Sequence, residues 1–151
     1  MNFIFRKMTL DDLEQVVAID QISFSLPWPA RSFFFEYDNP VSRCWVADLD
    51  GRVIAMMVGW LFVDDIHIAT FATHPDFRRQ GIGKALFFHT LKSAKAEGAR
   101  TAFLEVRESN FAAIEMYRQF GFIENGRRKG YYKDNQEDAI LMLLEHLPEA
   151  E

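Results

Sequence analysis

The segment from Arg78 to Gly83 separates a strand-like pattern at residues 65–73 from a helical pattern that begins at Ile82. Gly81 and Gly83 have no Cβ atom, so the backbone can turn sharply there and come close to a ligand. The first N–H groups of the helix have no partner inside the helix, and the flanking arginines add positive charge. A helix start of this kind binds anions, which predicts a phosphate-bearing ligand. A solvated helix start after a glycine-rich turn is the alternative.

This loop matches neither of two common nucleotide-binding motifs. The phosphate loop of nucleoside triphosphatases needs Gly-x-x-x-x-Gly-Lys and then Ser or Thr, whereas Arg78 stands at the first glycine position and Ala85 follows Lys84. The dinucleotide fingerprint needs a third glycine where this chain has Leu86. The sequence therefore predicts a phosphate cradle of a third kind.

Length and composition favour a single cytoplasmic domain over residues 1–151. The chain has 151 residues, 49% of them hydrophobic, and a net charge of −5, which argues against general nucleic-acid binding. Its one cysteine, Cys44, excludes an internal disulfide and favours a reducing compartment. The longest apolar run, Val53 to Val63, is 11 residues, short of the ~20 that cross a bilayer. We expect no membrane association, and a monomer or weak dimer.

Hydrophobic periodicity and turn residues predict eleven elements in the order β-α-α-β-β-β-α-β-α-β-β. A capping box at Thr9 and Asp12 begins the first helix, and residues 145–151 are expected to fray. The remaining helices are expected at 30–38, from 82 to Gly98 and at 110–120, and the strands at 3–6, 43–48, 52–62, 65–73, 101–107, 122–131 and 137–144. This is an α/β (α+β) pattern, a mixed sheet with helices on its faces.

The unit from residue 65 to residue 107 has the order strand, glycine loop, helix, strand. Such a unit places its two strands parallel in one sheet, with the helix as the crossover. Ligands in these folds bind near the C-terminal ends of the parallel strands, where the glycine loop lies.

This element order, with Arg78-x-x-Gly81-x-Gly83 at the strand–helix junction, resembles the GNAT superfamily of acetyl-CoA-dependent N-acetyltransferases. The resemblance implies a largely antiparallel sheet of about seven strands with a parallel central pair and about four helices. It also implies acetyl-CoA as cosubstrate, without a metal, its pyrophosphate in the glycine loop. The residues expected to bind it are Phe71, Ala72, Thr73, Arg78, Arg79, Gln80, Gly81, Ile82, Gly83, Lys84, Asn110 and Tyr117.

Further stretches resemble the RimI type within this superfamily, which acetylates the N-terminal alanine of a small-subunit ribosomal protein. They are Phe24-x-x-Pro27-Trp28, Leu104-Glu105-Val106-Arg107-x-Ser109-Asn110, Ala113-Ile114-x-x-Tyr117-x-x-x-Gly121-Phe122 and Arg127-Arg128-x-x-Tyr131-Tyr132 through Ile140. His67-Ile68 is instead similar to archaeal and eukaryotic N-terminal acetyltransferases. The implied partner is a peptide or protein N-terminus, with a ribosomal protein favoured.

The resemblance implies Glu105 as general base and Tyr117 as general acid. Strand alternation places Glu105 on the face opposite Leu104 and Val106. A free carboxylate titrates near ~4.3, so partial burial would have to raise its pKa, or it would act through a water. A phenol near ~10 is close to a thiol near ~8.5, so proton donation to a thiolate is only slightly uphill. The alternatives are a solvated Glu105 paired with Arg107, and a core tyrosine.

The acceptor is expected in a groove between residues 23–32 and the 125–137 loop, with Trp28, Glu105, Tyr131 and Tyr132 as substrate-binding residues. A hydrophobic plug at these aromatic residues is the alternative. At neutral pH a lysine needs roughly 3–4 kcal/mol more than an α-amine to lose its proton, which favours an N-terminal acceptor.

Several other roles stay open. Asn110 could cap the helix that follows it as well as contact coenzyme A, and His67 could assist as a second base. The competing functions are acetylation of a small-molecule amine or lysine, and a non-enzymatic acyl-CoA-binding module.

Overall fold

The computed structural model describes residues 2–149, which form one seven-stranded sheet in the order β1-β2-β3-β4-β5-β7-β6. All neighbouring strands pair antiparallel except β4 and β5, which pair parallel. This confirms the fold and the parallel central pair that the sequence predicted. The strands are β1 (Ile4–Lys7), β2 (Ser42–Leu49), β3 (Arg52–Phe62), β4 (Asp65–Thr73), β5 (Thr101–Arg107), β6 (Ile123–Arg128) and β7 (Ala139–Leu144).

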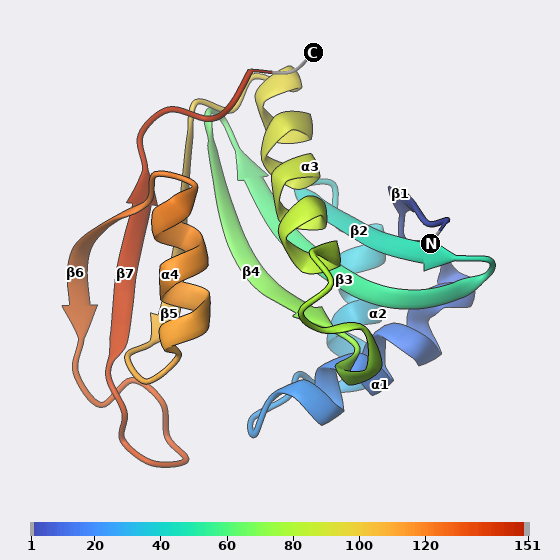
Figure 1. Ribbon diagram of the computed structural model, residues 1–151, viewed down its shortest axis with the longest axis horizontal. Coiled ribbons are helices and arrows are strands. Elements are labelled where there is room, and N and C mark those ends of the chain that lie inside the picture. The colour runs from blue at the N-terminus through green and yellow to red at the C-terminus, as the bar shows by residue number, and fades with distance from the viewer. Residues whose placement is uncertain (1, 150–151) are drawn as a thin grey trace.

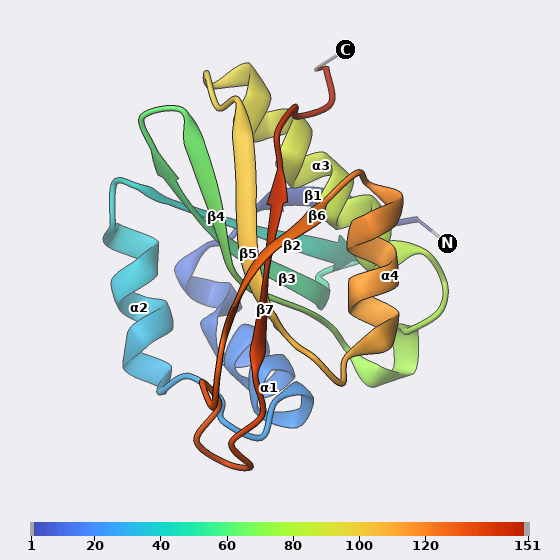
Figure 2. The ribbon, with the colours of Figure 1, turned by 90° about the vertical axis from the view of Figure 1, so that its left-hand side faces the viewer.

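Four α-helices cover the two faces of the sheet (Figure 2). The first pair, α1 (Leu13–Ser23) and α2 (Ala30–Asp38), packs on one face around Val16, Ile19 and Phe33. The second pair, α3 (Ile82–Ala96) and α4 (Phe111–Gln119), packs on the other face in a larger cluster that includes Leu86 and Phe87. Two 3-10 turns, η1 (Leu10–Asp12) and η2 (Pro75–Phe77), precede α1 and α3.

The last two strands are shorter than the sequence predicted. Strands expected at 122–131 and 137–144 are Ile123–Arg128 and Ala139–Leu144, so residues 129–138 form a loop. Leu147, in the tail expected to fray, is held in place, because its side chain is buried and its amide donates to the Arg100 carbonyl. Fraying of the rest of the tail stays a prediction. Residues 150 and 151 lie outside the described part of the chain. Within residues 2–149, no helix combines the length and apolar character needed to cross a bilayer.

The β4 and β5 strands stay together for only three residue pairs, from Asp65–Thr101 to His67–Phe103. Beyond His67 they separate, and Figure 1 shows their C-terminal ends well apart. A β-bulge lies at the same place: Val58 pairs with Thr70 and Gly59 with Ile68, so Ala69 is the extra residue. Bulges bend a strand and increase its twist, which directs β4 away from β5.

The bulge also changes which way the end of β4 faces. His74 donates its amide to the Ile54 carbonyl of β3, so alternation points the N–H and C=O groups of Thr73 and Phe71 away from β3. Within residues 2–149, no strand pairs with that edge. The separation therefore leaves the end of β4 with backbone groups that have no strand partner on the side away from β3.

The start of α3 lies against this end of β4. A Cβ atom at Gly83 would come within 2.7 Å of Thr73 Oγ1 and 3.3 Å of Phe71 Cζ. The missing side chain therefore lets helix and strand approach each other, whereas the sequence argument assigned it to a ligand. Gly81 has the other role expected of it, a φ of 80° that favours glycine.

We predict that Gly83→Ala lowers the free energy of unfolding by about 1–2 kcal/mol, because overpacking exceeds the gain in helix propensity. Urea denaturation measures this. The double variant Gly83→Ala/Thr73→Ala, which removes the nearest atom, should recover most of the loss. A single variant as stable as the wild type would show that the helix start is not tightly packed.

Candidate active site

Glu105 and His67 meet where β4 and β5 separate. Both carboxylate oxygens of Glu105 lie at hydrogen-bond distance from His67 Nε2, at 2.9 and 3.0 Å. The imidazole stacks on Phe103, with ring centroids 4.5 Å apart, and meets Trp60 edge-on at 5.2 Å. The predicted strand alternation is confirmed, but the alternative in which Glu105 pairs with Arg107 is wrong. The carboxylate is oriented by a histidine whose ring is itself fixed between two aromatic side chains.

The aromatic contacts continue to Trp28. Trp28 stacks on Trp60 at 6.3 Å, and Trp60 Nε1 donates to buried Glu36 at 2.8 Å. The Trp28 amide donates to Asp20, which is 1% exposed, at 2.8 Å. Trp28 is therefore packed much as the hydrophobic-plug alternative described. Through Trp60 it connects His67 to residues 24–29, which join α1 to α2 and are called the α1–α2 segment below.

Tyr117 projects from α4 into the cluster on the opposite face. Its ring packs against Phe87 at 5.3 Å and Phe122 at 5.8 Å. Burial raises the pKa of Tyr117 well above its usual range, so the phenol stays protonated and proton donation is more uphill than the sequence argument assumed. Among the described residues, the only fully enclosed side-chain N or O atom without a hydrogen-bond partner is His89 Nε2. The Tyr117 hydroxyl also makes no hydrogen bond with the described residues. Since it is not among the fully enclosed atoms, it keeps some access to solvent.

Tyr132 interacts electrostatically with both Tyr117 and Glu105. Burial raises the pKa of Tyr132 to about 12, the Arg107 charge opposes this shift, and the negative charge of Glu105 adds to it. Tyr132 in turn contributes to the raised pKa of Tyr117. Tyr131 packs edge-on against Tyr132 at 5.2 Å and is 43% exposed. Tyr132 is thus near enough to Glu105 and to Tyr117 for their charges to interact, and all three residues were predicted from sequence.

The glycine loop presents a row of free amides. Arg79 and Gly81 have φ values of 63° and 80°, and Gly81 precedes α3 without a side-chain cap. Within residues 2–149, the amides from Gln80 to Lys84 have no protein acceptor. Several converging amides at a helix start suit the oxygens of a polyphosphate. The loop therefore fits the anion that the sequence predicted.

The charged residues around the loop differ in their surroundings. Arg78 donates to the Thr73 carbonyl at 3.0 Å and to Ser23 Oγ at 3.2 Å, so it ties the loop to β4 and α1. Arg79 and Gln80 are exposed, and Lys84 Nζ donates to Gln119 at 3.2 Å. Asn110 Oδ1 accepts from the Ala113 amide at 3.3 Å, which is the capping role, and its side-chain NH₂ is not used in that bond.

The opening separates two chemically different sides. Glu105 and His67 lie on the face covered by α1 and α2, whereas Tyr117 lies in the cluster with α3, together with Leu104 and Val106 of β5. A carboxylate on one side and a phenol on the other can act on a ligand that passes between the strands. Residues 2–149 hold no group of three His, Cys, Asp or Glu side chains placed to bind a metal.

The candidate active site does not coincide with either of two hollows on the protein surface. Hollows of about 430 and 400 Å³ lie along α1 and beside α2, lined by residues such as Leu13, Val17 and Tyr37 and not by Glu105 or Tyr117. The convergence of titratable groups and free amides identifies the site instead.

Comparison with known proteins decides the family. Residues 13–122 match the acetyltransferase (GNAT) family. The chain belongs to the GNAT acetyltransferase family. It is an N-acetyltransferase and uses acetyl-CoA as its acetyl donor, which confirms the family and cosubstrate implied by the sequence resemblance.

Relatives of this acetyltransferase cover nearly its whole length. A Bacillus subtilis protein provisionally named ribosomal protein bS18-alanine N-acetyltransferase is 38% identical over 138 residues, 91% of each chain. An N-alpha-acetyltransferase of Sulfolobus acidocaldarius is 33% identical over 156 residues, 94% of this chain and 92% of that one. The crystal structure of the ribosomal-protein-S18-alanine N-acetyltransferase from Escherichia coli superposes with a TM-score of 0.91 at 30% identity, covering 99% and 97% of the two chains.

Sequence reasoning on this acetyltransferase missed some residues that shape the site. The bulge at Ala69 had one signal, Gly59 in the middle of a strand, because an interior strand glycine often marks a bulge or a close approach. A Cβ atom at Gly59 would lie 3.0 Å from Ile66 Cδ1. The supports from Asp20 and Glu36 had no sequence signal, since each contacts a residue that only folding brings near.

Asp20 yields a prediction on stability. Burial raises the pKa of Asp20, against the opposing effect of the Trp28 amide, so the folded state holds its proton to higher pH than the unfolded state. The wild-type free energy of unfolding should therefore fall, relative to Asp20→Asn, as pH rises from about 4 toward neutrality. Asparagine keeps an acceptor for Trp28 and does not titrate. Urea denaturation of both proteins across this range tests the prediction, and a difference that is flat or rises with pH contradicts it.

Proposed function

We propose that this acetyltransferase transfers the acetyl group of acetyl-CoA to the N-terminal α-amine of a protein, and that its acceptor is a ribosomal protein that begins with alanine. The observation that carries the acceptor assignment is the similarity, over about nine tenths of the chain, to proteins named for bS18-alanine acetylation. The Sulfolobus relative, named an N-alpha-acetyltransferase, supports the α-amine more generally. We place the protein in the cytoplasm, where such an acceptor is made.

The separated strands provide the proposed binding site for acetyl-CoA. The free amides from Gln80 to Lys84 would hold the pyrophosphate, with Arg79 adding positive charge. The outward N–H groups of Phe71 and Thr73 and the C=O group of Phe71 would pair with the amide-containing arm of coenzyme A, as an added strand does. We assign Arg78 the role of holding the end of β4, and Asn110 both its capping bond and a coenzyme contact.

Glu105 is the proposed base. The neutral amine attacks the thioester carbonyl, so that an N–C bond forms, and the attacking nitrogen must lose a proton. Glu105 can accept this proton directly or through a water, and it lies at the opening on the face of α1 and α2. His67 holds both carboxylate oxygens and would keep them directed toward the amine.

Tyr117 is the proposed acid. When the C–S bond breaks, the leaving thiolate, whose thiol titrates near ~8.5 in water, needs a proton or a hydrogen bond. The Tyr117 hydroxyl is protonated throughout the neutral range because burial raises its pKa. Tyr117 belongs to the buried cluster that includes α3, so it lies on the same side of the sheet as the glycine loop.

Trp28, Tyr131 and Tyr132 are the proposed walls of the acceptor site. Trp28 belongs to the α1–α2 segment and the two tyrosines to the 129–138 loop, and both segments lie beside Glu105. An α-amine suits a single carboxylate base better than a lysine, which needs roughly 3–4 kcal/mol more to become neutral at pH 7.

We predict that Glu105→Gln lowers kcat about 100-fold on an alanine-starting peptide, with the KM for acetyl-CoA within about twofold of the wild type. Tyr117→Phe should lower kcat by about tenfold or more for the same reason. Thiol release under saturating acetyl-CoA measures both. A Glu105→Gln enzyme with full turnover removes the base assignment.

The acceptor is tested with three substrates at equal concentration: an alanine-starting peptide, the same peptide with a blocked N-terminus and an internal lysine, and a polyamine. We expect turnover on the first alone, with mass spectrometry placing the acetyl group on the α-amine. Turnover restricted to the lysine or the polyamine would contradict the proposed function.

A further inference from the structure

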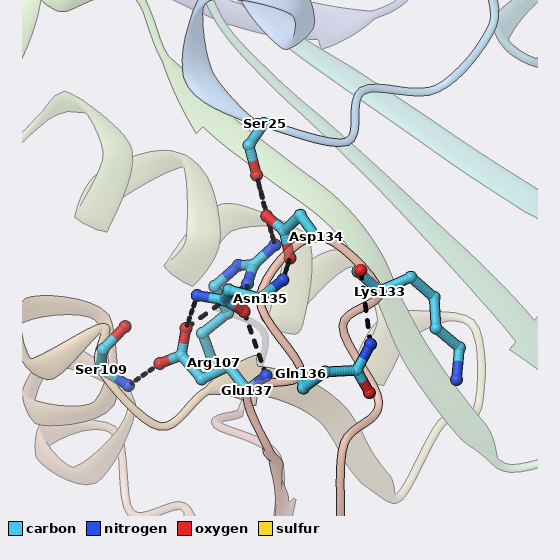
Figure 3. Close-up of polar contacts among 8 residues, drawn as sticks. All are labelled: Ser25, Arg107, Ser109, Lys133, Asp134, Asn135, Gln136 and Glu137. Atoms are coloured by element: carbon cyan, nitrogen blue, oxygen red, sulfur yellow. Dashed lines mark hydrogen bonds and ion pairs between the residues drawn. The ribbon is translucent and has the colours of Figure 1, made fainter.

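Arg107 lies two residues beyond Glu105 on the same face of β5, and it joins three parts of the chain (Figure 3). Its guanidinium donates to Asp134 at 2.8 Å, to Asn135 at 3.2 Å and to Glu137 at 3.4 Å, all in the 129–138 loop. It also donates to Ser25 Oγ at 3.4 Å, in the α1–α2 segment.

The two segments also contact each other and the start of α4. Ser25 Oγ donates to the same Asp134 oxygen that accepts from Arg107, and the Ser109 amide donates to Glu137 at 2.7 Å. In Figures 1 and 2 the loop and the α1–α2 segment lie side by side at the lower end of the molecule. Arg107 is therefore at the centre of a contact between both proposed walls of the acceptor site.

Arg107 also contacts Tyr132, one of the residues proposed to bind the acceptor. Its guanidinium carbon lies 4.0 Å from the centroid of the Tyr132 ring, a cation–π contact. The loop adds its own bonds, from the Tyr132 amide to the Glu137 carbonyl at 3.1 Å and from the Gln136 amide to the Tyr132 carbonyl at 2.8 Å. The planar fork of an arginine can make the ion pairs and the ring contact at once, which the ammonium group of a lysine cannot.

We propose that Arg107 is a positioning residue for the acceptor: it holds the 129–138 loop and Tyr132 against the Ser25 segment, so that the acceptor site is formed before the peptide binds. This inference rests on the proposed N-terminal acetylation. Side-chain exposures of 24% for Arg107, 24% for Asp134 and 10% for Glu137 mean that these ion pairs are partly shielded from solvent. None of the Arg107 side-chain contacts involves the glycine loop or the outer edge of β4, so we expect substitution of this side chain to affect acetyl-CoA binding little.

The test compares Arg107→Met with Arg107→Lys and with a matched control, Arg43→Met. Arg43 is also a half-buried arginine that forms a bidentate ion pair, with Glu97 at 2.9 and 3.0 Å, but it joins β2 to the end of α3, outside the proposed site. If Arg107→Met leaves the site formed about a tenth of the time, the KM for an alanine-starting peptide rises about tenfold. The KM for acetyl-CoA should stay within about twofold. Arg107→Lys should lie between, and Arg43→Met should match the wild type.

Amide hydrogen exchange of residues 129–138, followed by mass spectrometry, gives a second readout that needs no turnover. Exchange should speed up in Arg107→Met and stay unchanged in Arg43→Met. Unchanged loop exchange, or equal increases in the KM values for peptide and acetyl-CoA, would overturn the proposal. If Arg107→Met does not fold, Ser25→Ala, which removes the Ser25 contacts with Asp134 and Arg107 but leaves the Arg107 ion pairs, is measured by the same two readouts. A wild-type enzyme inactive on every N-terminal peptide would contradict the proposed function, and exchange would still decide the role of Arg107.

Discussion

The early end of parallel pairing between β4 and β5 is the constraint on which the rest of the site depends. The two strands share three residue pairs, and the bulge at Ala69 then bends β4 away while β5 continues along β7. A fully paired sheet would have used the edge groups of Phe71 and Thr73 in its own hydrogen bonds. The separation leaves the Phe71 groups and the Thr73 N–H without a strand partner, and it leaves the two backbones apart at the end of β4.

The separation of β4 and β5 explains why the proposed site needs few functional groups. One side presents the glycine loop and Tyr117, and the other presents Glu105 with His67. In the proposed function an acyl donor and an amine approach from opposite sides of the sheet and meet at one point, and this orientation would supply much of the catalytic effect. The proposed acid and base would need only to be held in place, and packing around Phe87 and stacking of His67 on Phe103 provide this.

The sequence could predict those parts of the site that depend only on residues close together in the chain. The glycine loop follows from backbone freedom and helix ends, and the face on which Glu105 lies follows from strand alternation. His67 and Glu105 are 38 positions apart in the sequence, and Arg107 and Asp134 are 27 positions apart. Local sequence patterns therefore could not predict either contact. The bulge was missed because alternation assumes a regular strand, and the raised pKa of Tyr117 depends on how deeply α4 is buried.

Backbone amide chemical shifts, followed while acetyl-CoA is added without an acceptor, test most directly whether the coenzyme binds between β4 and β5. If the opening binds the coenzyme as described, the largest shifts fall on Phe71, on Thr73 and on the amides from Gln80 to Lys84, and β1 changes little. Large shifts elsewhere, with these amides unmoved at saturation, would contradict the placement of acetyl-CoA between β4 and β5.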